Sequence, residues 1–241
     1  MCGIGTTMII ANLKGYCSIG NELEYKYYRD MVGYDDNAII DEFNKDSLFS
    51  GDIIFTYHID GNIESFLKRT GRYRYPIHII NKDAKELTRD DLEEYGGKLV
   101  VITSPPYNRA AEHDQAQIDA MPEEKKHGHR PAGYENPKNI AMMDAEEYQK
   151  NMHKVWEVMY NLNVAYIVTV TRDHIDGGRV YKLSSITDWC VTTSGYEKIE
   201  HIQAKIPYLS LFKRMNYKNH HEKKGLPLID YEDVQIFRRK L

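Results

Sequence analysis

Residues 103–108 read Thr-Ser-Pro-Pro-Tyr-Asn and directly follow an apolar run over residues 99–102. The run is typical of a compact buried strand in a parallel sheet. The two prolines fix the backbone and remove two N–H donors, so the loop presents carbonyl oxygens to a ligand. Such oxygens can accept hydrogen bonds from an exocyclic amine, and the ring of Tyr107 can stack on a base. The structural alternative is a stiff turn that binds nothing.

The beginning of the chain carries a second signal, the glycine-rich segment Cys2-Gly3-Ile4-Gly5-Thr6-Thr7. Residues 6–13 are predicted to form a helix that Gly15 ends. Glycines allow the backbone to approach a ligand closely, and a helix N-terminus offers unpaired N–H groups. Residues 16–23 then predict a strand, near whose end lies Glu22. An acid at this place matches the one that binds ribose hydroxyls in nucleoside-binding folds. A tight strand–helix turn is the alternative.

Asp83 is a third candidate, because it follows the predicted strand over residues 75–80. Ligands of open α/β sheets bind at the carboxyl ends of the strands, where an acid can accept a hydrogen bond from an adenine amino group. The charged residues 84–95 predict a helix that ends at Gly96 and Gly97. Asp83 therefore suits the N-cap of that helix equally well.

Strand and helix signals alternate along the rest of the chain. Strands are predicted over residues 165–170, 199–206 and 234–237, and a helix over residues 184–194 that ends at Gly195. Asp144 caps another predicted helix, whose core residues recur at helical spacing: Tyr148, Met152, Val155, Trp156, Met159 and Tyr160. Residues 52–59 resemble a strand and residues 63–69 a helix. This order predicts a parallel-dominated sheet covered on both faces.

The composition limits the class of protein. A chain of 241 residues with 41% hydrophobic and 28% charged residues fits one α/β domain with an insertion. No apolar run reaches the roughly 18–20 residues that span a bilayer, and no secretory signal opens the chain. Three cysteines are too few for a disulfide scaffold or a cysteine-rich zinc site, so a cytoplasmic location is expected. No metal is expected either, because His113, Asp114, His127 and His129 match no ligand spacing.

Basic residues gather in two stretches, although the net charge is −4. Residues 65–74 hold four bases and no acid, and residues 213–224 hold five bases and one acid. Such stretches are compatible with phosphate contact, and equally with a solvated surface. The candidate nucleic-acid-binding residues are Lys68, Arg69, Arg72, Arg74, Lys213, Arg214, Lys218, Lys223 and Lys224.

Together these segments resemble the S-adenosylmethionine-dependent DNA amino-methyltransferases, specifically those with a Thr-Ser-Pro-Pro-Tyr catalytic loop that methylate the exocyclic amine of cytosine. In that family a strand ends in Asp-Pro-x-Cys-Gly-x-Gly-Thr-Thr, and residues 1–7 match its second half closely. Residues 171–183 resemble the strand and basic turn that follow in related enzymes. Residues 231–239 resemble their last strand. The resemblance spans nearly the whole chain and rests on two specific motifs.

The resemblance implies a Rossmann-like methyltransferase fold of the α/β class, with a seven-stranded, mostly parallel sheet and helices on both faces. By this resemblance, the catalytic loop consists of Ser104, Pro105, Pro106 and Tyr107. The residues that bind the methionine part of S-adenosylmethionine are Cys2, Gly3, Gly5, Thr6 and Thr7. Glu22 binds its ribose, and Asp83 binds its adenine. No cysteine is needed as a nucleophile, since amine methylation in this family forms no covalent enzyme intermediate.

The implied activity is site-specific methylation of the exocyclic amine of a cytosine flipped out of DNA, the cytosine-N4 reaction of restriction-modification systems. Methylation of adenine N6 in DNA, methylation of an RNA amine, and a non-catalytic nucleic-acid-binding subunit are the alternatives.

The sequence departs from the family at its start, where the Asp-Pro dipeptide and the strand before it are absent. We therefore expect a truncated first strand, which leads to weak cofactor binding unless an N-terminal segment or a second polypeptide completes it. Residues 25–74 exceed a plain methyltransferase core and are expected to be an insertion. Residues 109–143 are expected to form a long active-site loop.

Overall fold

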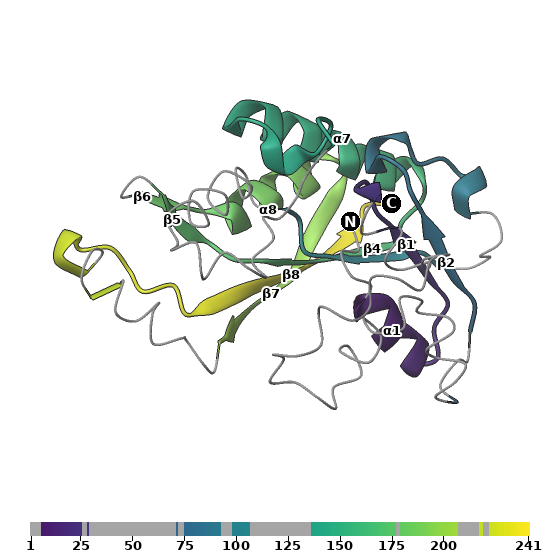
Figure 1. Ribbon diagram of the computed structural model, residues 1–241, viewed down its shortest axis with the longest axis horizontal. Coiled ribbons are helices and arrows are strands. Elements are labelled where there is room, and N and C mark those ends of the chain that lie inside the picture. Colours follow the sequence, from purple (N-terminus) through teal and green to yellow (C-terminus); the bar gives the residue numbers. More distant parts are fainter. Residues whose placement is uncertain are drawn as a thin grey trace, which may run out of the picture. The chain divides into compact units, whose positions relative to one another are not determined.

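A computed structural model describes residues 6–25, 28, 71, 75–92, 98–106, 136–176, 179–206, 217–218 and 222–241 (Figure 1). The chain divides into two compact units. The first unit comprises Met1–Gly96 and Asn108–Ala145, and the second comprises Gly97–Tyr107 and Glu146–Leu241. The expected strand over residues 52–59 and helix over residues 63–69 lie outside the described residues. In the described part of the chain, no helix combines the length and the apolar character that crossing a membrane requires.

The first unit begins with helix α1 (Thr6–Leu13), at the predicted bounds. Gly15, with a φ of +88°, turns the chain into strand β1 (Ser18–Asn21), which pairs in parallel with β2 (Ile77–Ile80). The Asn12 side-chain amide donates to the Tyr75 carbonyl at 2.6 Å, which ties α1 to the chain just before β2. Both predicted strands are therefore present, in shorter form.

The helix predicted over residues 84–95 is wrong in its described part. Two short 3-10 turns, η1 (Ala84–Glu86) and η2 (Asp90–Leu92), occupy it instead. Leu87 leaves η1 in an extended conformation, with φ −63° and ψ 137°. The Thr88 N–H then donates to Asp91 Oδ2 at 2.7 Å and begins a new turn. Side chains that cap locally compete with a continuous helix, and a run of charged residues does not reveal this competition. A third short turn, η3, spans Ile140–Met142.

The second unit contains a four-stranded sheet in the order β3-β4-β8-β7 (Figure 1). Its strands are β3 (Val100–Thr103), β4 (Tyr166–Thr171), β7 (Tyr196–Lys205) and β8 (Tyr231–Arg239). β3 and β4 run parallel, whereas β8 runs antiparallel to both β4 and β7. The sheet is thus mixed rather than parallel-dominated as predicted. The segments β5 (His174–Asp176) and β6 (Arg179–Tyr181) form a separate antiparallel pair.

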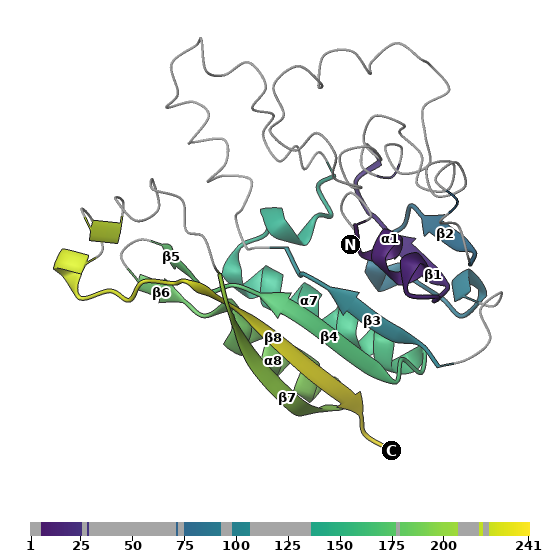
Figure 2. The same ribbon diagram turned by 90° about the horizontal axis from the view of Figure 1, so that it is seen from below.

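Helices α7 (Ala145–Asn161) and α8 (Leu183–Thr193) lie on one face of this sheet (Figure 2). Five of the six predicted core residues of α7 are buried, and Tyr160 is half-buried. On the sheet, Ile167 and Phe237 are paired in register and are both fully buried. Burying a large apolar side chain contributes about 1.5–3 kcal/mol. The core of this unit therefore lies between the two helices and the sheet.

Strand β3 is less buried than its sequence predicts. Val100 and Ile102 are 49% and 54% exposed. They are paired in register with Tyr166 and Val168, which alternate with the buried residues of β4 and so face away from the two helices. Among the described residues of this unit, helices cover one face of the sheet (Figure 2), and the covering of both faces stays a prediction. β3 also stands at the edge of the described sheet.

Gly195 ends α8 with a φ of +103°, and a Cβ at this position would lie 2.6 Å from Tyr160 Cε2. The Tyr160 ring has little freedom to move, because it packs edge-on against Tyr196 and lies under the Arg239 guanidinium. Gly195→Ala should destabilise the protein by about 1–2 kcal/mol through its backbone conformation. Overpacking against the ring should cost a further ~1–3 kcal/mol.

Urea unfolding measures the loss of stability in Gly195→Ala. Gly225→Ala is the matched control, since Gly225 has a φ of +67° and no neighbouring atom within 4 Å of an added Cβ. Equal losses in the two variants would contradict the steric contribution at Gly195.

Candidate functional site

Two of the predicted cofactor acids lie at the same edge of the first unit. Glu22 follows β1 directly, and its N–H donates to the Ile80 carbonyl at 2.9 Å, which continues the pairing with β2. Asp83 comes three residues after β2 ends. Both carboxylates are buried, with exposures of 5% and 7%. Because β1 and β2 are parallel, this edge is the carboxyl edge, where α/β sheets bind ligands.

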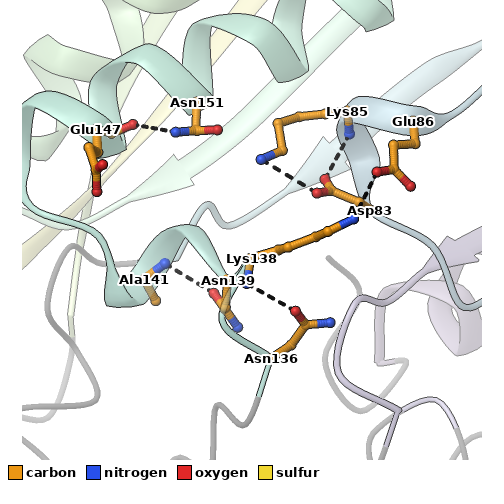
Figure 3. A network of polar contacts seen from close by, with 9 residues as sticks. All are labelled: Asp83, Lys85, Glu86, Asn136, Lys138, Asn139, Ala141, Glu147 and Asn151. Carbon is orange, nitrogen blue, oxygen red and sulfur yellow. Dashed lines mark hydrogen bonds and ion pairs between the residues drawn. The ribbon is translucent and has the colours of Figure 1, made fainter.

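Each of the two acids also has a structural task. Glu22 accepts a hydrogen bond from the Glu24 N–H at 3.1 Å. Asp83 Oδ1 accepts from the Lys85 N–H at 3.0 Å, and Asp83 Oδ2 lies 3.4 Å from Lys85 Nζ (Figure 3). The capping alternative for Asp83 is therefore present, although it caps a 3-10 turn and not a long helix. A carboxylate oxygen can accept more than one hydrogen bond, so the capping leaves room for a ligand amine.

Glu24 is a buried carboxylate that the sequence did not single out. It is 2% exposed and accepts from Asn139 Nδ2 at 2.7 Å and from the Asn136 N–H at 3.3 Å. Asn139 in turn caps η3 by accepting from the Ala141 N–H at 3.0 Å (Figure 3). These contacts hold the chain after β1 against residues 136–141. No motif marks Glu24, because its partners are more than 110 residues away in the sequence.

Further side-chain contacts of the first unit lie near Asp83. Asn81 Nδ2 donates to the Glu22 carbonyl at 2.8 Å, and Lys138 Nζ contacts Glu86 at 3.0 Å (Figure 3). Lys82 Nζ lies 2.8 Å from Asp91 Oδ2. The segments that carry Glu22 and Asp83 are thus tied together by side-chain hydrogen bonds.

The contact with Lys82 makes Asp91 a source of pH-dependent stability. The hydrogen bond from Lys82, followed by that from the Thr88 N–H, lowers the pKa of Asp91 from 3.8 to about 2. Because the folded-state pKa is depressed, this stabilisation is fully present above about pH 4 and is lost as the pH falls towards about 2. Asp91→Asn should therefore be less stable than the parent near neutral pH, and the difference should shrink over this acid range.

Chemical denaturation at several pH values measures the difference. A gap between parent and variant that stays constant down to about pH 2 would show that Asp91 does not titrate as described.

The proline loop follows β3 in the second unit. Ser104 is exposed, Pro105 is buried and Pro106 is half-buried. The Pro106 carbonyl accepts a hydrogen bond at 2.9 Å from the hydroxyl of Tyr148, on α7. Within the described part of the chain, neither the Ser104 hydroxyl nor the Pro105 carbonyl has a hydrogen-bond partner. The loop thus holds one exposed hydroxyl and one carbonyl of a buried proline, and neither has a hydrogen-bond partner in the described part of the chain. Tyr107 lies outside the described residues.

Tyr148 is a second residue whose role the sequence did not reveal. Its helical spacing predicted only a core side chain, and it is indeed fully buried. The signal available in the sequence was the tyrosine itself, because a buried hydroxyl usually has a hydrogen-bond partner. Which group provides that partner depends on the packing of α7 against the loop.

Several other predicted site residues lie outside the described residues: Cys2, Gly3, Gly5, Lys68, Arg69, Arg72, Arg74, Lys213 and Arg214. Thr6 and Thr7 begin α1. Lys218, Lys223 and Lys224 are exposed, as a phosphate-binding or a merely solvated lysine would be. Asp173 caps the start of α8 by accepting from the Ser184 N–H and hydroxyl at 3.1 and 2.9 Å.

Of the cysteines that the structure describes, Cys17 is exposed and Cys190 is buried. Burial raises the pKa of the Cys190 thiol to about 12, so this thiol is protonated at neutral pH and is a poor nucleophile. Among the described residues, no group of three or more His, Cys, Asp or Glu side chains is placed to hold a metal ion. The candidates His113, Asp114, His127 and His129 lie outside them.

Comparison with known proteins gives weak likenesses only. No family model matches the sequence, and no curated protein matches it. Three solved structures of one protein from Thermus thermophilus, provisionally described as a DNA modification methylase, are similar in fold. Their sequence identities are 18%, 17% and 17%, and their TM-scores are 0.37, 0.38 and 0.36. They match 66%, 66% and 64% of this chain, and the third contains S-adenosyl-L-methionine.

This chain spans about half the length of that protein, namely 51%, 52% and 53% of the three structures. Identities and TM-scores in this range do not assign an activity. The functional interpretation therefore depends on the residues of this chain.

Proposed function

We propose that this protein transfers the methyl group of S-adenosylmethionine to the exocyclic N4 amine of cytosine in DNA. The observation that carries the proposal is the hydrogen bonding of the loop formed by Ser104, Pro105 and Pro106. Ser104 is exposed and the Pro105 carbonyl has no partner among the described residues, whereas the Pro106 carbonyl is occupied by Tyr148. A loop whose second proline is anchored, and whose serine hydroxyl and first proline carbonyl have no hydrogen-bond partner among the described residues, suits the binding of an amine that has two hydrogens to donate.

The chemistry needs such a loop, because an aromatic amine is a poor nucleophile. Its lone pair is delocalised into the ring. Hydrogen bonds from the amine to Ser104 Oγ and to the Pro105 carbonyl would draw the nitrogen towards a tetrahedral shape and direct its lone pair. S-adenosylmethionine supplies an electrophilic methyl group on sulfur. The amine would form the new N–C bond, the sulfur would keep the electrons of the broken S–C bond, and the proton that the amine loses would pass to solvent water. Orientation of this kind can lower a barrier by several kcal/mol.

The first unit supports a nucleoside-containing cofactor. Two buried carboxylates at the carboxyl edge of adjacent parallel strands fit the hydroxyl donors of a ribose and the amino donor of an adenine. In this proposal Glu22 binds the ribose and Asp83 the adenine. The glycine-rich start holds the methionine part through Cys2, Gly3, Gly5, Thr6 and Thr7.

The target base would leave the duplex to reach the loop, since its amine is otherwise stacked between neighbours. Tyr107 would stack on the flipped cytosine. The phosphates on either side would meet the basic residues, of which Lys218, Lys223 and Lys224 are exposed in the described chain. The other proposed phosphate contacts are Lys68, Arg69, Arg72, Arg74, Lys213 and Arg214. A cytoplasmic location and a role in restriction-modification belong to the same proposal.

The exposure of the edge strand β3 favours pairing with a further strand. Val100 and Ile102 are half exposed on a strand without Pro or a charged residue, and proteins usually protect such an edge. We propose that an apolar strand pairs with β3, supplied by residues N-terminal to Met1 or by a second polypeptide. The seven-stranded sheet that the sequence predicts belongs to the same proposal.

Transfer of a labelled methyl group tests the activity. The purified protein, unmodified genomic DNA and methyl-tritiated S-adenosylmethionine should give labelled DNA, and digestion to nucleosides should place the label on deoxycytidine. Label on deoxyadenosine, or on RNA in a parallel reaction, would replace the proposed substrate. If a folded protein that binds the cofactor labels neither nucleic acid, the enzyme proposal is wrong and a non-catalytic subunit is the better description.

A further inference from the structure

The side chain of Tyr148 is fully buried, and its one polar atom, the hydroxyl oxygen, lies against the proline loop. Tyr148 lies in the first turns of α7, among buried residues that recur at helical spacing. Its ring is 0% exposed, and its hydroxyl donates to the Pro106 carbonyl at 2.9 Å. A phenylalanine would fill the same space, so the hydroxyl has a task that packing does not require.

The two prolines cannot hold the loop in place through backbone N–H groups. Pro105 and Pro106 have no N–H group, so neither can donate a backbone hydrogen bond. The pyrrolidine ring fixes φ of Pro106 but leaves its ψ free, whereas ψ of Pro105 is restricted because a proline follows it. The direction of the Pro106 carbonyl depends on the ψ of Pro106. A donor fixed in the helix core, such as the Tyr148 hydroxyl, therefore sets the torsion that the proline ring does not set.

The consequence extends to the next residue through the covalent structure. The Pro106 carbonyl and the Tyr107 N–H belong to one planar peptide unit. When the carbonyl direction is fixed, the direction in which the chain enters Tyr107 is fixed as well. We infer that Tyr148 is a positioning residue for the catalytic loop, which orients the peptide unit between Pro106 and Tyr107. The effect on catalysis rests on the proposed function. Tyr148 acts through the loop and is not proposed to contact the base or the cofactor.

Tyr148→Phe tests the inference, because it removes one oxygen atom and leaves the ring. The same unit offers a matched control in Tyr196→Phe. Tyr196 is also 0% exposed, and its hydroxyl donates to the backbone carbonyl of Val164 at 3.2 Å. Each variant loses one buried hydrogen bond to a backbone carbonyl, and both should show a similar drop in Tm.

The two variants should differ in catalysis. Tyr148→Phe should lower kcat roughly 10- to 100-fold while KM for S-adenosylmethionine stays within about twofold, because misplacement of a reacting group affects the chemical step. Tyr196→Phe should keep kcat within about twofold of the parent. A parent-like kcat in Tyr148→Phe, or an equal fall in both variants, would overturn the inference.

The amide nitrogen resonance of Tyr107 provides a readout that does not depend on activity, because this nitrogen and the Pro106 carbonyl belong to one peptide unit. The resonance should shift in Tyr148→Phe and keep the parent position in Tyr196→Phe. If the parent binds S-adenosylmethionine and transfers no methyl group, the proposed function fails, and the resonance still decides whether Tyr148 orients this peptide unit. An unchanged resonance in Tyr148→Phe would show that it does not.

Discussion

Tyr107→Ala is expected to lower methyl transfer to DNA roughly 5- to 150-fold at saturating cofactor, because stacking of a base on an aromatic ring is worth about 1–3 kcal/mol. Cofactor affinity should stay at the parent value, since in the proposed function the ring stacks on the base and does not contact the cofactor. Tyr107→Phe should keep most of the activity, because the ring provides the stacking. Single-turnover rates for the three proteins measure the effect directly.

Equal rates in the parent, Tyr107→Ala and Tyr107→Phe would show that residues 104–107 form a structural turn. A large loss in both variants would assign the effect to the hydroxyl instead of the ring. Pro105→Ala provides a related comparison, because it releases the backbone that presents the open carbonyl. It should reduce turnover with little change in cofactor affinity.

Glu22→Ala should weaken S-adenosylmethionine binding by about 1–3 kcal/mol, which corresponds to a roughly 5- to 150-fold higher Kd. The physical reason is the loss of a charge-assisted hydrogen bond from the ribose. Calorimetry measures the Kd, and Glu22→Gln, which keeps the shape and loses the charge, should fall between the parent and the alanine variant.

Glu24→Gln is the control for that experiment. Glu24 is also buried, but Asn139 and Asn136 already donate to its carboxylate. It should lower stability and leave the Kd near the parent value. If Glu24→Gln weakens binding and Glu22→Ala does not, the ribose acid was assigned to the wrong carboxylate.

The sequence predicted local features well where a strong local signal existed. The bounds of α1 match the prediction, because Gly15 ends the helix through its positive φ. The buried residues of α7 follow from their spacing alone, and Gly195 ends α8 as expected. The positions of Glu22 and Asp83 at one edge followed from the prediction of two strands before them. These features depend on neighbours in the sequence.

Features that depend on distant partners were not predictable from the sequence. Strand β3 looked fully buried, but its apolar side chains are exposed at the edge of the described sheet. The direction of β8 is set by its antiparallel register with β4 and β7, and no residue type specifies it. The contacts of Glu24 with Asn139 and of Tyr148 with Pro106 join segments far apart in the chain. The failed helix over residues 84–95 has a local cause, the capping side chains Asp83 and Asp91, which accept from the N–H groups of Lys85 and Thr88.

Mass spectrometry of nucleosides tests the central claim most directly. DNA is taken from cells that express this chain, with and without the genomic codons upstream of Met1, and from cells that carry an empty vector. The proposed function predicts N4-methylcytosine in DNA from at least one of the expressing strains and none in the control. A strain with N4-methylcytosine only when the upstream codons are present would also support a strand that pairs with β3. DNA without any added methyl group in both expressing strains would contradict the claim that this protein methylates cytosine in DNA.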